Sequence, residues 1–345
     1  MQAYNYQGKD LILTQSPTIQ RVSQRLILAL TAMLKDTGME LYLRDITQAY
    51  TQSTTLLSRD FFVRPPPELG LEECQILKVI KPLYGIPEAG NHWFNTYHCH
   101  HVKKLGMQQS TYDACLLTTV KRGDCFGIVG LQTDDTLTLG NLPFADKEEE
   151  ELQKAKFLAK PREQLTHTHP IKFNGGMIKL TSLEANTISL TQEHQCQNLR
   201  PVNVKQPSDI TSSRGVTRKT VTPKDQYVAQ RAKGAYIATI CQPEAAFDLS
   251  HAAQVINPQE VDVKYLNKRL QWQASNHSRG LSFIPLDINS IQLIAFTDSS
   301  FANNQDLSSQ MGFVIVLAES NGHNGFQWHF TRQTYCTGLP SSANA

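Results

Sequence analysis

The chain has 345 residues, more than one ordinary hydrophobic core needs, so about two or three domains are expected. Hydrophobic residues account for 40% and charged residues for 19% of the sequence, values that fit a folded globular protein and exclude a wholly disordered one. The net charge of +2 at pH 7 neither requires nor excludes a polyanionic partner.

The sequence also bears on cellular location. The longest apolar run, Leu26–Leu34, is far shorter than a membrane span. The opening residues lack the basic and apolar regions of a signal peptide. Seven cysteines without C-x-x-C spacing indicate reduced thiols. We therefore expect an intracellular protein, in the cytoplasm or the nucleus, that is neither secreted nor bound to a membrane.

The N-terminal part of the chain is predicted to hold a helix and then a strand. The helix begins with Ser16 as its N-cap and Pro17 as its first residue, and it ends at Gly38. A largely buried strand within Glu40–Tyr50 ends near Asp45. The predicted inward face of the helix consists of Val22, Leu26, Ala29, Leu30 and Met33.

Two polar runs are predicted not to be sites. "YHCHHVKK" (Tyr97–Lys104) contains three histidines and a cysteine, but consecutive helical residues point around the circumference and cannot easily share a tetrahedral zinc site. We expect a solvated helix there, one that could face nucleic acid. The acidic run in "DKEEEELQKAK" is predicted to be the solvated face of an amphipathic helix, with Glu150 paired to Lys154.

The stretch "FGIVGLQTDDTLTLG" (Phe126–Gly140) predicts two strands joined by a tight turn. Apolar residues precede the aspartate pair, and Leu137 and Leu139 recur with period two after it. Asp134 and Asp135 therefore lie at a turn, where aspartate is common for purely local reasons. A functional role for the pair requires a third carboxylate from elsewhere in the chain.

The second half of the chain is predicted to be helical first and then to form strands. Residues 201–223 are rich in Ser, Thr, Lys, Arg and Pro and indicate a linker or loop. Helical patterns follow it, the last of them near Val261–Gln273. "IQLIAFTDSSFANNQ" and "MGFVIVLA" are then predicted to be strands.

Asp45 is the candidate for the third carboxylate. If its strand pairs beside the hairpin, Asp45, Asp134 and Asp135 converge. Three carboxylates in one place repel each other, so they are stable as anions only when cations neutralise them. Oxygen ligands suit Mg²⁺, and two such ions about 3.5–4 Å apart can stabilise the attacking and the leaving oxygen of a phosphoryl displacement. The three residues thus indicate nucleotidyl transfer.

Several motifs in one order resemble the polymerase region of a known class of mobile elements. "DITQAY" resembles the D-x-x-x-A-F/Y motif of reverse transcriptases from copia-type LTR retrotransposons, and "LYGIPEAGNHWF" resembles their L-Y-G-L-x-Q-A-x-x-x-W stretch. "QTDD" stands where they have Y-V-D-D, and "QSTYDACLL", "GAYIATICQPEAAFDLSHAAQ" and "FTDSSFANNQDLSSQMGFVIVL" follow in the family's order. The chain thus resembles the reverse transcriptase and ribonuclease H region of such a polyprotein, fungal-like and truncated at both ends.

The resemblance implies an α+β fold, a right-hand polymerase with fingers, palm and thumb, a connection region and an incomplete ribonuclease H-like α/β domain. Fingers and palm would span residues 1–145 and the rest of the palm and the thumb 146–205. A linker and connection helices would span residues 206–288, and the truncated ribonuclease H-like domain 289–345.

The resemblance also implies roles for single residues. Asp45, Asp134 and Asp135 match the catalytic palm carboxylates, of which the first two would be the principal ligands of two Mg²⁺ ions (Mn²⁺ could substitute) and the third an auxiliary one. Tyr50 matches the aromatic residue under the sugar of the incoming nucleotide, where it excludes a 2′ hydroxyl; an ordinary core aromatic is the alternative. Template, primer and deoxynucleoside triphosphates would be the partners.

The sequence departs from the family in three places. Gln132-Thr133 replaces the usual Tyr-Val. Glu88 stands near the nucleotide where the family has Gln, and an acid there would repel a triphosphate unless its neighbours compensate. The family's basic K-x-R-L-V strand would precede Met1, so we expect poor primer extension.

The last segment is predicted to lack ribonuclease H activity. Asp298 matches the first carboxylate of that active site. Asn344 stands where the family has its Glu, and a neutral amide cannot replace a carboxylate as a ligand of a divalent cation. Asp298 would then be a vestigial residue.

Two functions stay open from the sequence. One is RNA-directed DNA polymerisation, which the intact Asp45, Asp134 and Asp135 favour. The other is a non-catalytic relic that keeps the fold and at most binds nucleic acid, which Glu88 and the missing basic strand favour.

Overall fold

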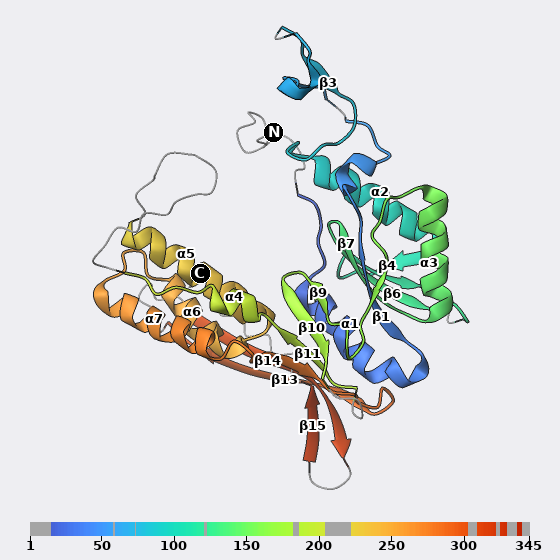
Figure 1. The fold of residues 1–345 in the computed structure, drawn as a ribbon. Helices are drawn as coiled ribbons and strands as arrows, with labels where there is room; N and C mark the ends of the chain where they lie inside the picture. The colour runs from blue at the N-terminus through green and yellow to red at the C-terminus, as the bar shows by residue number, and fades with distance from the viewer. Residues whose placement is uncertain are drawn as a thin grey trace, which may run out of the picture. The chain divides into compact units, whose positions relative to one another are not determined.

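The computed structural model describes residues 15–57, 59–72, 74–120, 123–181, 186–203, 222–302, 309–321, 325–329 and 337–339. Helices and strands are mixed throughout these ranges, in agreement with the expected α+β class. The chain forms two compact units, Met1–Phe173 and Asn174–Ala345 (Figure 1). The four-part division that the sequence suggests stays a prediction. None of the described helices is long and apolar enough to cross a membrane.

The first unit is built on a six-stranded antiparallel sheet with the strand order β4-β5-β6-β7-β1-β8. The strands of this sheet are β1 (Glu40–Asp45), β4 (Met107–Gln109), β5 (Leu116–Thr119), β6 (Gly127–Gln132), β7 (Asp135–Gly140) and β8 (Glu163–Gln164). The helices are α1 (Arg21–Leu34), α2 (Ala89–Lys104) and α3 (Leu142–Ala155). A separate antiparallel pair consists of β2 (Phe61–Val63) and β3 (Leu77–Val79), and β9 (Ile171–Phe173) ends the unit.

Side chains from helices cover both faces of this sheet. A Cβ atom at Gly127 of β6 would stand 2.4 Å from the ring of Phe144 in α3. One at Gly130 would stand 2.3 Å from Ile19 and 3.0 Å from Ile27 of α1. Because residues 127 and 130 face opposite sides of a strand, α1 and α3 lie on opposite faces of the sheet. The two central strands are accordingly buried on both sides, with five buried residues each.

The predicted start of the first helix is wrong. Thr18 forms a β-bridge with Gln132, and the Ile19 amide donates to the carbonyl of Leu131 at 2.9 Å, so this segment is extended and α1 begins only at Arg21. The buried face also differs in part from the predicted one. Of the residues predicted to point inward, Val22 is 52% exposed. Ala29 is buried as predicted, and Ile27, Leu28 and Ala32 are buried as well.

The histidine run lies in α2, and the prediction of a solvated helix is wrong for its inner face. Trp93, Tyr97 and His101 are all at most 1% exposed. They are spaced by four residues, so they form one buried stripe. Burial lowers the pKa of His101 to about 3, so its ring is neutral at physiological pH.

The second unit contains a small antiparallel sheet and a group of helices. In the sheet, β11 (Ile188–Thr191) pairs with β10 (Gly176–Leu180) and with β12 (Leu281–Phe283). The helices are α4 (Glu193–Gln197), α5 (Pro223–Ile240), α6 (Ala246–Ala253) and α7 (Glu260–Ser275). Gly234 lets the last three approach closely, since a Cβ there would stand 2.8 Å from Gln273, 2.9 Å from Leu270 and 3.1 Å from Leu249.

The last described part of the chain is a second antiparallel sheet. It consists of β13 (Ile291–Ser300), β14 (Ser309–Asn321), β15 (Gly325–His329) and β16 (Thr337–Leu339). β14 pairs with each of the other three strands. The two strands predicted from the sequence are therefore confirmed as β13 and β14. β13 has no buried residue along its ten positions.

Candidate active site

The aspartate pair lies at a two-residue hairpin between β6 and β7, as predicted. Gln132 pairs with Asp135, so Thr133 and Asp134 form the turn. Thr133 has φ 53°, a left-handed conformation that is rare for a β-branched residue. Such backbone strain persists only where surrounding contacts enforce it, and it is concentrated at functional sites.

A buried tryptophan enforces this turn. The Trp93 indole Nε1 donates to the carbonyl oxygen of Thr133 at 2.8 Å, and the Trp93 side chain is completely buried. Its ring stacks on Tyr97 at 4.9 Å and meets Phe157 edge-on at 5.7 Å. The aromatic packing of α2 thus fixes the backbone from which Asp134 projects.

The strand that ends at Asp45 pairs directly beside the hairpin, which confirms the pairing on which the expected convergence depends. β1 and β7 are antiparallel, with Asp45 opposite Asp135. The Ile46 amide donates to the Asp134 carbonyl at 2.9 Å. The next position, Asp45 with Asp135, is therefore a non-hydrogen-bonded pair, the type with the shorter separation, about 4.5 Å between Cα atoms. Both side chains leave the same face of the sheet.

Like charges directly opposite on neighbouring strands destabilise a sheet. In this site the repulsion affects the pKa of Asp135. Burial raises the pKa of Asp135 to about 6, and the negative charges of Asp134 and Asp45 contribute to the rise. One cation is already present, because the Lys160 ammonium lies 2.5 Å from Oδ2 of Asp45.

The donor chemistry of this cluster suits a hard divalent cation such as Mg²⁺, since all three side chains offer carboxylate oxygens. The charge repulsion at Asp135 is what a bound cation would relieve. Within the described ranges, however, no three His, Cys, Asp or Glu side chains are arranged to hold a metal ion as they stand. Asp45 directs one oxygen to Lys160 instead.

Two tyrosines lie in the electrostatic field of Asp134. Tyr50, in the short 3-10 helix Ala49–Gln52, stacks on Tyr84 with ring centroids 4.4 Å apart and an interplanar angle of 24°. Burial, and after it the charge of Asp134, raises the pKa of both phenols. Tyr50 also packs against the buried cluster of Phe61, Ile86 and Ala89. Tyr84 was not singled out by the sequence, although it stands inside the quoted "LYGIPEAGNHWF" motif.

Glu88 has the compensating neighbour that the sequence could not identify. Arg59 contacts it through two nitrogens, Nε to Oε1 at 3.1 Å and Nη2 to Oε2 at 2.9 Å. The Arg59 guanidinium also lies 4.9 Å from the centre of the Phe61 ring. Glu88 is 6% exposed, and its buried carboxylate is paired with the partly exposed Arg59 guanidinium. Its charge is balanced within the protein.

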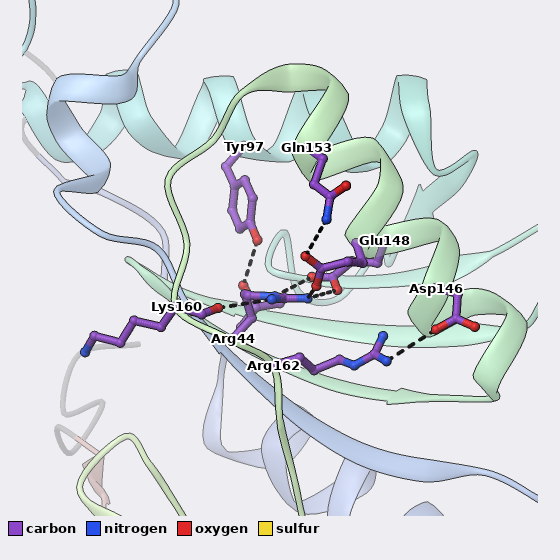
Figure 2. A network of polar contacts seen from close by, with 9 residues as sticks. Arg44, Tyr97, Asp146, Glu148, Gln153, Lys160 and Arg162 are labelled. Atoms are coloured by element: carbon purple, nitrogen blue, oxygen red, sulfur yellow. Dashed lines mark hydrogen bonds and ion pairs between the residues drawn. The ribbon is translucent and has the colours of Figure 1, made fainter.

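A buried arginine ties β1 to the segment that carries Lys160. Figure 2 shows Arg44, next to Asp45 in the chain, among the polar side chains of α3. Its guanidinium donates to Glu148 at 2.8 and 3.3 Å, to Glu149 at 2.5 Å and to the Lys160 carbonyl at 3.1 Å. Glu148 is only 4% exposed. The prediction that the acidic run is a solvated face is therefore wrong for Glu148, although the Glu150–Lys154 pair is confirmed.

Asp298 lies in the second unit, on β13 opposite Gly312. Asp298 is exposed, and its Oδ1 accepts a hydrogen bond from the Ser299 amide at 2.9 Å. Among the described residues no group of three metal-binding side chains includes it. Asn344 lies outside the described residues.

Comparison with known proteins gives a family match over more than half of the chain. A family model described as "Reverse transcriptase (RNA-dependent DNA polymerase)" matches residues 2–198. The matched range includes Asp45, Asp134 and Asp135, the two stacked tyrosines and Lys160.

Curated relatives match over a shorter stretch. The truncated transposon Ty1-A Gag-Pol polyprotein of Saccharomyces cerevisiae (strain ATCC 204508 / S288c) is 29% identical over 72 residues, which are 21% of this chain and 6% of that polyprotein. The Ty1-DR5 and Ty1-LR2 Gag-Pol polyproteins of the same strain show the same identity over 72 residues, 21% of this chain and 4% of each polyprotein. The matched region is a small fraction of each relative's length.

Proposed function

Because this chain belongs to the reverse transcriptase (RNA-dependent DNA polymerase) family, we propose that it carries out RNA-directed DNA synthesis by nucleotidyl transfer onto a primer 3′ hydroxyl. One observation carries the proposal. The register of β1 against β7 places Asp45 opposite Asp135, which directly follows the turn residue Asp134. Carboxylates from these three neighbouring positions offer the oxygen donors that a divalent-cation reaction needs.

In this proposal Asp45 and Asp134 are the principal metal ligands and Asp135 is an auxiliary one. When bound, two Mg²⁺ ions would lower the pKa of the attacking 3′ hydroxyl and stabilise the charge on the departing pyrophosphate. The protein's own contribution is positional. Trp93 fixes the strained turn that presents Asp134, and Arg44 anchors the strand that ends in Asp45.

The stacked tyrosines support a nucleotide site beside the carboxylates. We assign Tyr50 to the sugar of the incoming deoxynucleotide, where its ring would exclude a 2′ hydroxyl. Tyr84 braces that ring from the other side, since the two stack at 4.4 Å. Glu88 does not weigh against a triphosphate nearby, because Arg59 balances its charge. This removes one of the two arguments for a non-catalytic relic.

The larger architecture and the partners follow from the family and are proposed with it. The first unit would hold fingers and palm, and the second the thumb, the connection helices and a ribonuclease H-like part. An RNA or DNA template with its primer and deoxynucleoside triphosphates would be the partners.

We further propose that the ribonuclease H-like part is inactive. Asp298 is exposed, and its carboxylate accepts from its own neighbour Ser299. Incubation with an RNA–DNA hybrid and Mg²⁺ or Mn²⁺ should give no cleavage. Cleavage that disappears in Asp298→Asn would contradict this part of the proposal.

Primer extension on an RNA template tests the main proposal. Asp134→Asn keeps the side-chain size and removes the charge, so we expect extension to fall at least about 100-fold, equivalent to ~2.7 kcal/mol in the barrier. Asp36→Asn, in the exposed turn after α1, removes the same charge far from the hairpin in sequence and should leave extension unchanged. Extension by the unaltered chain that survives Asp134→Asn would contradict the proposal. No extension at all would favour the relic.

A further inference from the structure

Lys160 is held beside Asp45 by its backbone on two sides. The Lys160 amide donates to the Asp45 carbonyl at 2.9 Å, and the Lys160 carbonyl accepts from Arg44 Nη1 at 3.1 Å. The preceding residues continue this pairing, because Ala159 bridges Ile46. Figure 2 shows the Lys160 carbonyl bonded to Arg44. The position of this lysine is therefore fixed by β1 and not by a mobile loop.

The side chain of Lys160 contacts one of the two carboxylate oxygens that Asp45 can offer to a metal ion. Its Nζ lies 2.5 Å from Oδ2 of Asp45. A Mg²⁺ ion lies about 2.1 Å from its oxygen ligands, so an ion on this oxygen and the ammonium would be at most about 4.6 Å apart. Like charges at that separation repel, so binding of the ion to this oxygen disfavours the ammonium contact.

The contact is also easily broken. The Lys160 side chain is 61% exposed and that of Asp45 is 33% exposed, so the ammonium can turn into water without leaving a buried charge behind. Its backbone anchors stay in place when it turns. An exchange of ammonium for metal thus costs little and needs no movement of the sheet.

On the basis of the function proposed above, we propose that Lys160 is a built-in counter-ion that competes with the divalent cation for Asp45. It offsets the repulsion among Asp45, Asp134 and Asp135 when no divalent cation is bound. Metal binding displaces it, so Lys160 lowers the affinity of the cluster for metal. The cluster is then loaded only where the divalent cation concentration is high enough to outcompete the lysine.

Mn²⁺ binding to the whole chain, followed by the electron paramagnetic resonance signal of free Mn²⁺, measures this competition without any catalytic assay. Lys160→Gln should bind Mn²⁺ about two- to fivefold more tightly than the unaltered chain, the range of an exposed ion pair. Lys160→Met should do the same, and Lys160→Arg should stay within about twofold of the original. Circular dichroism melts of each variant establish that it is folded.

Two matched controls separate competition at Asp45 from a general change in charge. Arg162→Gln removes a cation two residues away that pairs with Asp146 and not with the cluster. Lys154→Gln removes a lysine whose partners, Glu150 and Glu151, lie on the acidic helix. Neither should tighten binding at the site. If either tightens it as much as Lys160→Gln does, the effect is one of net charge and the inference is wrong.

Asp134→Asn separates this inference from the function on which it rests. If the unaltered chain binds Mn²⁺ and Asp134→Asn weakens that binding, the cluster is a metal site. Equal affinity of the unaltered chain and Lys160→Gln would then overturn the role of Lys160 alone. If no variant binds Mn²⁺, or if Asp134→Asn has no effect on binding, the proposed function fails and the inference fails with it.

Discussion

Removal of the buried Arg44 guanidinium should strongly destabilise the first unit. The Arg44 side chain is 3% exposed and that of Glu148 is 5% exposed, so Arg44→Met leaves the Glu148 carboxylate inside the protein without its cation. Breaking a buried ion pair in this way costs roughly 3–5 kcal/mol. The contact to Glu149 adds little to this figure, because that side chain is 41% exposed. A loss of this size is a large part of the total stability of a typical domain, about 5–15 kcal/mol.

A double-mutant cycle distinguishes a lost interaction from lost packing. Glu148→Met alone should cost less, since Arg44 keeps Glu149 and the Lys160 carbonyl as partners. The double variant Arg44→Met/Glu148→Met buries no charge and should recover about 2–3 kcal/mol relative to the sum of the single changes. The recovered energy is the coupling between the two side chains.

Urea unfolding followed by tryptophan fluorescence measures these values. Trp93 is the only tryptophan of the first unit, so the Trp272→Phe/Trp328→Phe background reports that unit selectively. If Arg44→Met costs less than about 1 kcal/mol, or if the two changes add within about 0.5 kcal/mol, water must reach the pair, and the reasoning from its burial is wrong.

Three further changes test other parts of the site by their effect on stability. Thr133→Gly should raise the free energy of unfolding by about 1 kcal/mol, because glycine adopts φ 53° without strain; unchanged or lower stability in a thermal melt would refute this. Asp135→Asn should stabilise the protein at pH 7 by about 1–2 kcal/mol, since the folded state raises the pKa of Asp135 to about 6 and so disfavours its charge. A loss of stability would show that the carboxylate is not under repulsion. Burial lowers the pKa of His101 in the folded state to about 3. The stability that neutral His101 contributes is therefore fully present above pH ~6.5, and the free energy of unfolding falls by up to ~1.4 kcal/mol per pH unit below that value. His101→Leu should flatten this part of the denaturation profile, and an unaltered slope would contradict the assignment.

The sequence predicts the hairpin and the individual strands of the site, but it predicts the pairing between distant strands only in part. The alternation around Asp134 and Asp135 indicated a hairpin, and a strand ending near Asp45 was visible from its apolar residues. That these strands pair, with Asp45 opposite Asp135, depends on a register between distant segments, which periodicity does not determine. It came from the resemblance to a family.

The errors have identifiable causes. The first helix began later than predicted because Thr18 and Ile19 pair with β6, a contact across more than 100 residues. A charged run alone does not show which of its members meets a buried arginine, so the sequence does not distinguish Glu148 from its solvated neighbours. Arg44 indicates that such a partner exists, because a charged residue inside an apolar strand needs a buried partner of opposite charge.

The histidines of α2 offered a similar signal. Trp93, Tyr97 and His101 are spaced by four residues, the spacing of one helix face. That pattern indicates a buried stripe that includes a histidine, whereas the polar composition of the run favours a solvated helix. Tyr84 and Arg59, by contrast, could be connected to Tyr50 and Glu88 only in three dimensions.

The central claim is that Asp45 and Asp134 together hold divalent metal ions. A crystal structure of the chain with Mn²⁺, with anomalous scattering data that locate manganese, tests this claim most directly. We predict an anomalous peak within about 2–2.3 Å of a carboxylate oxygen of both residues, with the Lys160 ammonium moved away from Asp45. If Asp45 keeps its contact with Lys160 at saturating Mn²⁺ and no peak lies at the hairpin, the claim is contradicted.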